Sequence, residues 1–187
     1  MNRRDLIKAI GIITGYSMVG GATLLTSCNT IKNKNIFADK ITIELLNEIA
    51  ETLLPKTDTP GAKDADCGTM MATIINDCYS TKEQDVIIKG LPEFENYCKD
   101  KFDNPFIKLS TEEKLTALKA TAEEASAYNK SKLSEAPVHY FTMLKQLAIF
   151  SFFTSEKGAT KALRYLPVPG KYDGDFNYRK GDKAWAT

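Results

Sequence analysis

Apolar side chains recur at helical spacing in one segment after another, and this period constrains the fold of the chain more than any other feature of its sequence. Leu45, Leu46 and Ile49 share one helical face. The same spacing returns in four further segments, 66–79, 81–102, 110–125 and 137–153. None of them alternates apolar and polar residues as a half-buried strand does. The sequence therefore predicts an all-α fold, a compact bundle of about five helices joined by short loops.

Capping and stop signals mark several helix ends. Thr42 is expected to cap the first helix, and Pro55 to end it. The third and fourth helices open with capping-box patterns, a hydroxyl residue followed three positions later by Glu or Gln: Thr81 with Gln84, and Ser110 with Glu113. Pro92 lies inside the third helical segment, so we expect a kink or a break there.

The last helical segment is apolar nearly all round, which predicts a buried helix. Pro137 suits its first turn. A membrane span is not expected, because His139, Lys145 and Gln146 interrupt the segment and its uncharged run is too short.

The chain changes character from about residue 154. Prolines and glycines punctuate this part of the sequence, and aromatic side chains lie between them. We interpret it as an irregular C-terminal arm. The arm could wrap on its own helical core or dock on another protein, and the two roles can coexist.

The N-terminal segment 1–27 has the three parts of a signal peptide. Arg3, Arg4 and Lys8 form a basic region, the uncharged stretch Ala9–Leu25 follows, and small residues end the segment. The paired arginines resemble the twin-arginine motif of the export pathway for folded proteins. An ordinary secretory signal that contains two arginines is the alternative.

Leu25-Thr26-Ser27-Cys28 resembles a bacterial lipobox, in which the cysteine receives the lipid. A plain cleavage site with a chance cysteine is the alternative. Two or three acyl chains would anchor the protein stably to a membrane, whereas one chain binds only marginally. We therefore expect residues 28–39 to be a lipidated tether, residues 40–187 to form the helical domain, and the mature protein to lie in the cell envelope outside the cytoplasm.

The sequence contains few groups suited to catalysis or cofactor binding. It has no C-x-x-C-H motif for covalent haem, and its single histidine, His139, is expected to be structural. Asp58, Asp64 and Asp66 lack the full set of calcium ligands and are expected to form turns and caps. The 25 basic and 24 acidic residues give no strong field for nucleic acid. We predict no catalytic, cofactor-binding or metal-ligating residue in this chain.

Three cysteines remain after Cys28 is assigned to the lipid. If helices two and three form an antiparallel hairpin that turns near Thr81, Cys67 and Cys98 lie opposite each other. This count makes Cys67–Cys98 the expected disulfide and leaves Cys78 as a small buried hydrophobic residue.

Three stretches of the mature chain resemble the family called gluconate 2-dehydrogenase subunit 3. The first is Leu45–Ala62, which ends in Pro-Lys-Thr-Asp-Thr-Pro-Gly-Ala. The second is Phe102–Leu115, and the third is Thr154–Ala159 together with Leu166–Gly174, which contains Pro-Val-Pro-Gly. The resemblance covers nearly all of the mature chain. Members of this family often carry a twin-arginine signal, which fits Arg3 and Arg4.

The resemblance implies a non-catalytic small subunit. In this family the small subunit accompanies a large FAD-dependent dehydrogenase of the glucose-methanol-choline type, often with a c-type cytochrome. The large subunit oxidises a sugar, a sugar acid or a glycoside, and the small subunit is thought to escort it through export. The lipobox, which many members lack, suggests that this chain is also the membrane anchor.

Two other hypotheses remain beside the one that the resemblance implies. A lipid-anchored sugar-binding protein could use the aromatic arm as a stacking surface. A stand-alone enzyme is the least favoured, because the cofactor motifs and catalytic clusters are missing.

The partner is expected to contact two segments that turn chemistry shapes, the loop 55–62 and the arm. Large exposed aromatic side chains are natural anchors in such contacts. The residues of the expected interface are Pro55, Thr57, Asp58, Thr59, Pro60 and Gly61 in the loop, and Tyr165, Pro167, Pro169, Gly170, Tyr172 and Trp185 in the arm.

Overall fold

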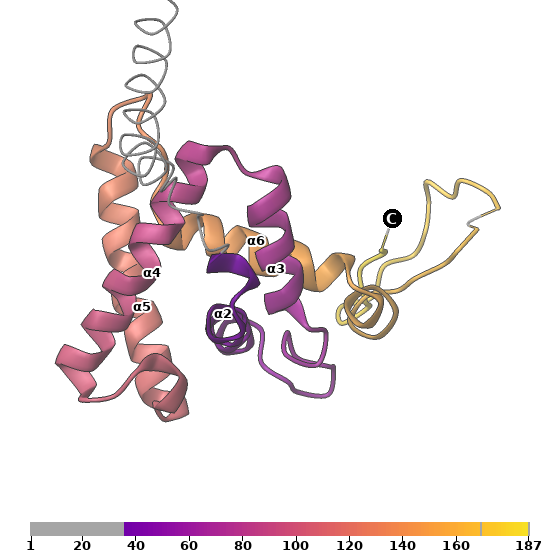
Figure 1. Cartoon of the computed structure of the whole chain (residues 1–187). Coiled ribbons are helices and arrows are strands. Elements are labelled where there is room, and N and C mark those ends of the chain that lie inside the picture. Colours follow the sequence, from indigo (N-terminus) through magenta and orange to yellow (C-terminus); the bar gives the residue numbers. More distant parts are fainter. Residues whose placement is uncertain (1–35, 169, 187) are drawn as a thin grey trace, which may run out of the picture. The chain divides into compact units, whose positions relative to one another are not determined.

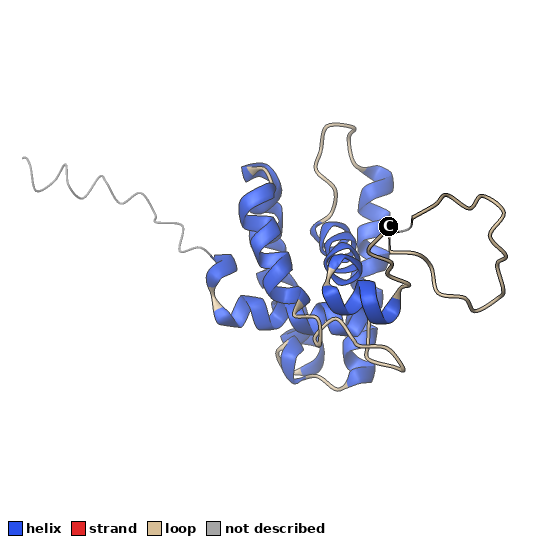
Figure 2. Ribbon diagram, turned by 90° about the vertical axis from the view of Figure 1, so that its right-hand side faces the viewer, coloured by secondary structure: helices blue, strands red, loops and turns tan. Residues whose placement is uncertain are grey.

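The segments with helical spacing are helices in the computed structural model, which describes residues 36–168 and 170–186 (Figures 1 and 2). The five α-helices of this part are α2 (Lys40–Leu53), α3 (Cys67–Cys78), α4 (Thr81–Phe102), α5 (Thr111–Ser131) and α6 (Tyr140–Thr154). Three short helical segments accompany them: η1 (Ile36–Ala38) precedes α2, η2 (Phe106–Lys108) lies between α4 and α5, and the π-helical η3 (Gly158–Ala162) follows α6. No strand occurs among these residues, so the prediction of an all-α fold is confirmed. Arg3, Arg4 and Cys28 lie outside the described residues.

Helix α6 lies at the centre of the packing. It contacts α2, α3, α4 and α5, and it crosses behind α3 and α4 in Figure 1. Leu144 and Ala148 on α6 are fully buried, as are Leu46 on α2, Met71 on α3 and Ile87 on α4. Burial of each such Leu, Ile or Met side chain contributes about 1.5–3 kcal/mol. A single hydrophobic core around α6 therefore holds the helices together.

Helices α2 and α3 approach each other closely. The amide of Gly68, in the first turn of α3, donates to the side-chain oxygen of Asn47 on α2 at 2.7 Å. A Cβ atom at Gly68 would lie 2.5 Å from the carbonyl oxygen of Ile43 and 2.7 Å from the backbone nitrogen of Asn47. Glycine is therefore needed at this position, because the two backbones approach too closely for a side chain.

The capping box before α4 lies one residue earlier than the sequence analysis expected. Ser80 accepts from the amide of Glu83 at 3.4 Å, and the Glu83 carboxylate accepts from the amide of Ser80 at 2.9 Å. Gln84 instead donates its side-chain amide to carbonyls at the end of α3, including that of Ile75 at 2.9 Å. The assignment of Thr81 with Gln84 was therefore wrong, and a carboxylate in the first turn of α4 also suits the helix dipole.

The capping box of Ser110 with Glu113 is confirmed at the start of α5. Helix α2 begins earlier than expected, because Asp39 rather than Thr42 is its N-cap residue. The buried ring of Phe37 in η1 packs into the core just before this point, which fixes where the chain enters the helix.

Two expectations based on prolines also need correction. Helix α4 continues through Pro92 without a break. The exposed ring of Pro92 removes one backbone hydrogen bond, and the burial of Leu91 and Phe94 on either side outweighs that loss. Helix α6 begins at Tyr140 with His139 as its N-cap residue, so Pro137 precedes the helix rather than forming its first turn.

Among the residues that the structure describes, no helix is both long enough and apolar enough to cross a lipid bilayer.

Candidate functional site

A carboxylate of α2 holds the loop between α2 and α3 in place. Glu51, near the end of α2, accepts from the backbone amides of Lys56 at 3.0 Å and Lys63 at 2.7 Å. Gly61 is buried against this carboxylate, and a Cβ atom there would lie 2.5 Å from its oxygens. The Glu51 carboxylate therefore fixes the conformation of the loop.

A second carboxylate of α2 joins the loop to α5. The Glu48 side chain, which is 12% exposed, pairs with Lys63 of the loop and with Lys114 of α5, the latter at 3.0 Å. Burial raises the pKa of Glu48, but the hydrogen bonds from the two lysines outweigh this effect and hold the pKa below its ordinary value. Glu48 is thus charged at neutral pH, and it ties the loop to the helical bundle.

The loop presents only part of its expected interface. Pro55, Thr57 and Asp58 are exposed, whereas Thr59 and Pro60 are half-buried. Gly61 is buried, so its expected role as a contact residue is corrected to one of shaping the loop.

The aspartates at this loop do not converge on one point. The Asp64 carboxylate pairs with Lys56 at 3.0 Å. Asp66 is the N-cap residue of α3, and its carboxylate accepts from the hydroxyl of Thr69 at 2.9 Å. No group of three or more His, Cys, Asp or Glu residues that could hold a metal ion occurs in the described ranges.

The C-terminal arm is a loop that closes on itself. The amide of Arg164 donates to the carbonyl of Ala184 at 2.8 Å, and the amide of Ala186 donates to the carbonyl of Arg164 at 3.0 Å. The Arg164 guanidinium lies 4.6 Å from the ring centre of Trp185 and 5.4 Å from that of Phe176. Figure 2 shows the chain leaving the helices as an open loop and returning to its base. These contacts fix both ends of the arm.

The arm leaves most of its aromatic side chains in solvent. Tyr172 is 95% exposed and Tyr178 is 75% exposed, while Tyr165 and Trp185 are about half exposed at 52% and 43%. The arm therefore does not wrap on its own helical core in this structure.

The other expected interface residues of the arm are also at the surface where they are described. Pro167 and Gly170 are exposed, and Pro169 lies outside the described residues. Lys157, just before η3, donates its ammonium group to the carbonyl of Asp64. This bond links the loop between α2 and α3 to the segment just before η3, after which the arm begins.

Helix α6 is buried on one side only, which corrects the expectation of burial nearly all round. Lys145, Gln146, Ile149, Phe150 and Phe153 are exposed, and Phe150 is 55% exposed. Uniform apolarity in the sequence could not show which side the other helices would leave uncovered.

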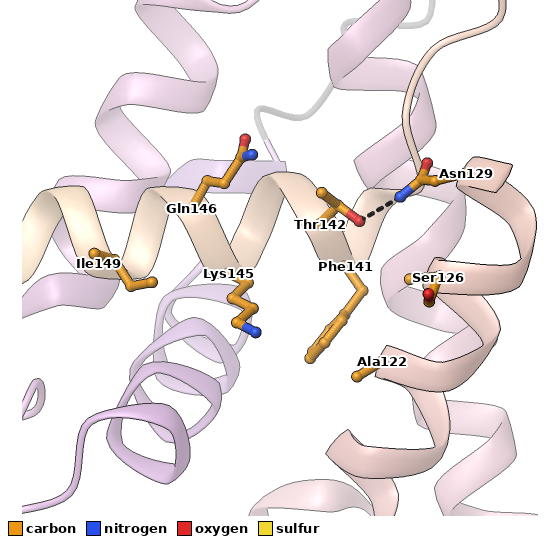
Figure 3. Close-up of a pocket in the computed structure, with 9 residues that line it drawn as sticks. Ala122, Ser126, Asn129, Phe141, Thr142, Lys145, Gln146 and Ile149 are labelled. Atoms are coloured by element: carbon orange, nitrogen blue, oxygen red, sulfur yellow. Dashed lines mark hydrogen bonds between the residues drawn. The ribbon is translucent and has the colours of Figure 1, made fainter.

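A groove of about 320 Å³ runs between α5 and the start of this exposed side (Figure 3). Asn129 on α5 bridges its end, donating to the hydroxyl of Thr142 at 2.8 Å. Phe141 and Lys145 project from α6 on the side of Ala122. The groove is lined by Ala122, Ala125, Ser126, Asn129, Phe141, Thr142, Lys145, Gln146 and Ile149. Helical spacing alone could not reveal this groove, because its residues come from two helices.

His139 is a structural residue, as expected. Its Nδ1 atom accepts from the amide of Phe141 at 3.2 Å, which caps α6, and its own backbone amide donates to Asn129 at 3.0 Å. Burial lowers the pKa of His139 below its ordinary value, against the opposing effect of nearby carboxylates such as Glu124. The imidazole is therefore mainly neutral at pH 7.

The disulfide expected from the hairpin count does not form. Cys67, Cys78 and Cys98 are all free thiols. The main packing partners of α3 are α2 and α6, and α4 packs on α6, α5 and η2, so α3 and α4 are not the expected antiparallel pair. Cys78 is exposed rather than buried. Burial raises the pKa of Cys67 to about 11 and that of Cys98 to about 12.

These observations define a small helical protein with three exposed features: a supported loop, a closed aromatic arm and a groove along the central helix. The model of the family gluconate 2-dehydrogenase subunit 3 matches residues 41–170, and the chain belongs to this family. Proteins of this family are subunits of an oxidoreductase complex, and this membership implies a larger partner. Comparisons with curated proteins and with solved structures find no match.

We expect Cys78 to be the only one of the three described cysteines that reacts rapidly with iodoacetamide in the folded protein at pH 8. Alkylation requires an accessible thiolate, and burial keeps Cys67 and Cys98 both inaccessible and protonated. Peptide mass spectrometry would count the modified sites, with denatured protein as the control in which all three react. Labelling of Cys98 as fast as Cys78, or a Cys67–Cys98 peptide, would contradict the structure.

Proposed function

We propose that this chain is the non-catalytic small subunit that escorts an FAD-dependent dehydrogenase through export and then anchors it at the membrane. The partner would be of the glucose-methanol-choline type and would oxidise sugars, sugar acids or glycosides. FAD would belong to that partner, and c-type haem to a further cytochrome subunit where one is present. Membership of the family supports the existence of a larger partner.

The observation that carries the proposal is the exposed aromatic surface on a fixed arm. Trp and Tyr are enriched among the few residues that supply most of the binding energy in protein interfaces. The side chain of Tyr172 is exposed and can bind a partner. The stacking of Arg164 on Trp185 and Phe176 already orders the ends of the arm. Less entropy is lost when such a preformed element binds a partner.

The exposed side of α6 offers a second contact region near the same end of the molecule. Phe150 and Phe153 lie on the last two turns of α6, and the arm follows that helix after η3. Clustered exposed apolar side chains of this size are typical of protein interaction sites. A large subunit could therefore contact the arm and α6 together.

An escort role accounts for the twin-arginine pattern. A flavoprotein must bind FAD before export if the cofactor is present only in the cytoplasm, and a folded-protein pathway allows this. The partner could then cross the membrane without a signal of its own by binding to this chain. The small subunit must be folded at that stage, and a single core around α6 suits an independently folded escort.

The sugar-binding alternative is less well supported by the geometry. A sugar stacks on a free aromatic face, but Arg164 covers one face of Trp185, and Phe176 meets the ring edge-on at 5.7 Å between ring centres. Tyr172 and Tyr178 stay free, but neither of them lines the groove between α5 and α6.

Purification of the chain from its native membrane tests the escort proposal directly. We expect a flavoprotein to co-purify, because the chain would be its small subunit. Replacement of Arg3 and Arg4 by Lys should retain both proteins in the cytoplasm, since the pathway reads the arginine pair. Export of the flavoprotein despite this change would refute the escort role, and a chain that purifies alone with bound sugar would favour the alternative.

The anchor role makes a separate prediction at Cys28. Cys28→Ala should prevent acylation and leave any exported chain, together with its flavoprotein, in the soluble fraction of the envelope. Fractionation and mass spectrometry of the mature N-terminus provide the measurement. An unmodified Cys28 in the wild-type mature chain would rule out the lipid anchor.

Tyr172→Ala should weaken binding of the partner by more than about 1 kcal/mol, roughly fivefold, without loss of stability. The reason is that this side chain is almost fully exposed in the free chain. Leu133→Ala is the matched control, because Leu133 is also highly exposed but precedes α6 rather than following it. Binding and thermal unfolding should be measured together, and an equal loss in both variants would argue against docking through the arm.

A further inference from the structure

The C-terminal part of the chain is basic, whereas the helical part is acidic. Residues 154–187 carry seven basic and four acidic residues, a net charge of +3. Residues 36–153 carry 13 basic and 19 acidic residues, a net charge of −6. The total charge of the chain conceals this difference, because the opposite charges of the two parts offset each other. A protein that meets the arm therefore meets a positively charged surface.

Two of the acidic side chains of the arm are engaged within it. The Asp182 carboxylate accepts from the amide of Arg179 at 2.9 Å, and the amide of Asp182 donates to the carbonyl of Arg179 at 2.9 Å, which closes a turn. The Asp173 carboxylate accepts from the amide of Asp175 at 3.3 Å, and it lies 3.9 Å from the ammonium group of Lys171. These carboxylates shape the arm, and only one of them forms a salt bridge.

Three basic residues meet at the base of the arm, and we call Lys161, Arg164 and Lys183 the basic cluster. The Lys183 ammonium group donates to the carbonyl of Lys161, and the backbone of Arg164 bonds to the residues that follow Lys183. Lys161 and Lys183 are exposed, and Arg164 is half-buried. None of the three forms a salt bridge with a carboxylate of the described residues. Their positive charge is therefore not balanced within this part of the chain.

Exposed aromatic rings lie beside the basic cluster. The guanidinium of Arg164 stacks on Trp185, whose side chain is still 43% exposed, and Tyr165 follows Arg164 with 52% exposure. Arginine and aromatic side chains are the residues that are most enriched in protein interfaces. The base of the arm thus combines apolar contact area with positive charge on a segment whose two ends are fixed.

We infer that the base of the arm binds an acidic segment of the larger partner subunit. Asp or Glu carboxylates of that segment would accept hydrogen bonds from the basic cluster, and its apolar atoms would contact Trp185 and Tyr165. The acidic helical part of the chain would repel the same segment, so the charge difference also selects the arm as the contact surface. The inference rests on the proposed function, because it requires a partner that covers the arm.

Trp185 allows the recognition of carboxylates to be measured directly, because it is the single tryptophan of the chain. The full chain in uncharged detergent micelles would be titrated with acetyl-tetraglutamate amide and with its neutral isostere, acetyl-tetraglutamine amide, while Trp185 fluorescence is followed. At about 0.1 M NaCl we expect the glutamate probe to bind at least about fivefold more tightly, the scale of two or three exposed ion pairs. The preference should disappear at about 1 M NaCl, where exposed charges are screened. Equal affinities at low salt, or no binding of either probe, would overturn the inference.

Variants connect this preference to the basic cluster. Lys161→Gln combined with Lys183→Gln should remove the preference for the glutamate probe, whereas Lys161→Arg combined with Lys183→Arg should keep it. The matched control is Lys119→Gln combined with Lys130→Gln, which removes the same charge from two exposed positions on α5. Thermal unfolding should be unchanged in all three double variants, because the backbone bonds of Arg164 still close the arm. An equal loss of the preference in the control variant would contradict a local role of the basic cluster and overturn the inference.

The native complex decides whether the partner supplies the acidic segment. We expect rising NaCl to release the flavoprotein from the membrane-purified chain, and the Lys161→Gln and Lys183→Gln variant to release it at lower salt than the α5 control. Flavoprotein retention that depends neither on salt nor on this variant would overturn the inference and leave the escort function standing. Absence of any flavoprotein from the wild-type chain would refute the escort function, whereas the probe titrations would still decide whether the arm recognises carboxylates.

Two other occupants of the basic surface give different results. Self-association of the purified chain that salt and the Lys161→Gln and Lys183→Gln variant both abolish, with unchanged flavoprotein retention, would identify the acidic helical part of a second copy. Unchanged retention together with loss of binding to phosphatidylglycerol vesicles in that variant, measured on the Cys28→Ala chain, would identify a lipid surface. Either result would overturn the inference of an acidic partner segment.

Discussion

Burial of one side of α6 is the constraint on which the rest of the structure depends. Four other α-helices use this helix as a common packing surface, and Leu144 and Ala148 are completely enclosed by them. The interior is close-packed, so the position of α6 fixes the positions of its neighbours. The groove with α5 exists because α6 forms one of its walls.

The same arrangement leaves the other side of α6 uncovered. A helix with apolar residues on nearly its whole circumference is normally buried, yet Ile149, Phe150 and Phe153 are exposed to solvent here. A subunit that is meant to be covered by a larger protein can keep such a surface, because the partner supplies the missing burial. Family membership and the exposed surface of α6 thus independently support the existence of a larger partner.

Two sets of contacts made by charged side chains stabilise segments that have no regular structure of their own. Glu48 and Glu51 hold the loop after α2 through bonds to Lys63 and to loop amides, and Arg164 holds the two ends of the arm through its contacts with Trp185 and Phe176. Hydrogen bonds to charged groups are stronger than neutral ones, and a guanidinium between aromatic rings adds a directional attraction. Contact surfaces built on loops can in this way be ordered before a partner binds.

The sequence by itself determined the fold class and the positions of the helices. Helical spacing is a local property, so α3 was placed within one residue of its ends, and the Ser110–Glu113 capping box was identified correctly because its bonds join residues three positions apart. The family resemblance was also present in short stretches of sequence, notably the proline- and glycine-rich loop and arm.

Only the tertiary structure decided which helices became neighbours, and the corrections to the disulfide and to the burial of α6 follow from that. The Cys67–Cys98 pair was expected from a hairpin of α3 and α4, but the apolar face of α3 packs against α2 and α6 instead. The uncovered side of α6 depends on which helices pack against the opposite side, and the groove combines residues of two separate helices. Helical periodicity reports which face of a helix is apolar, but long-range packing chooses the surface that covers it.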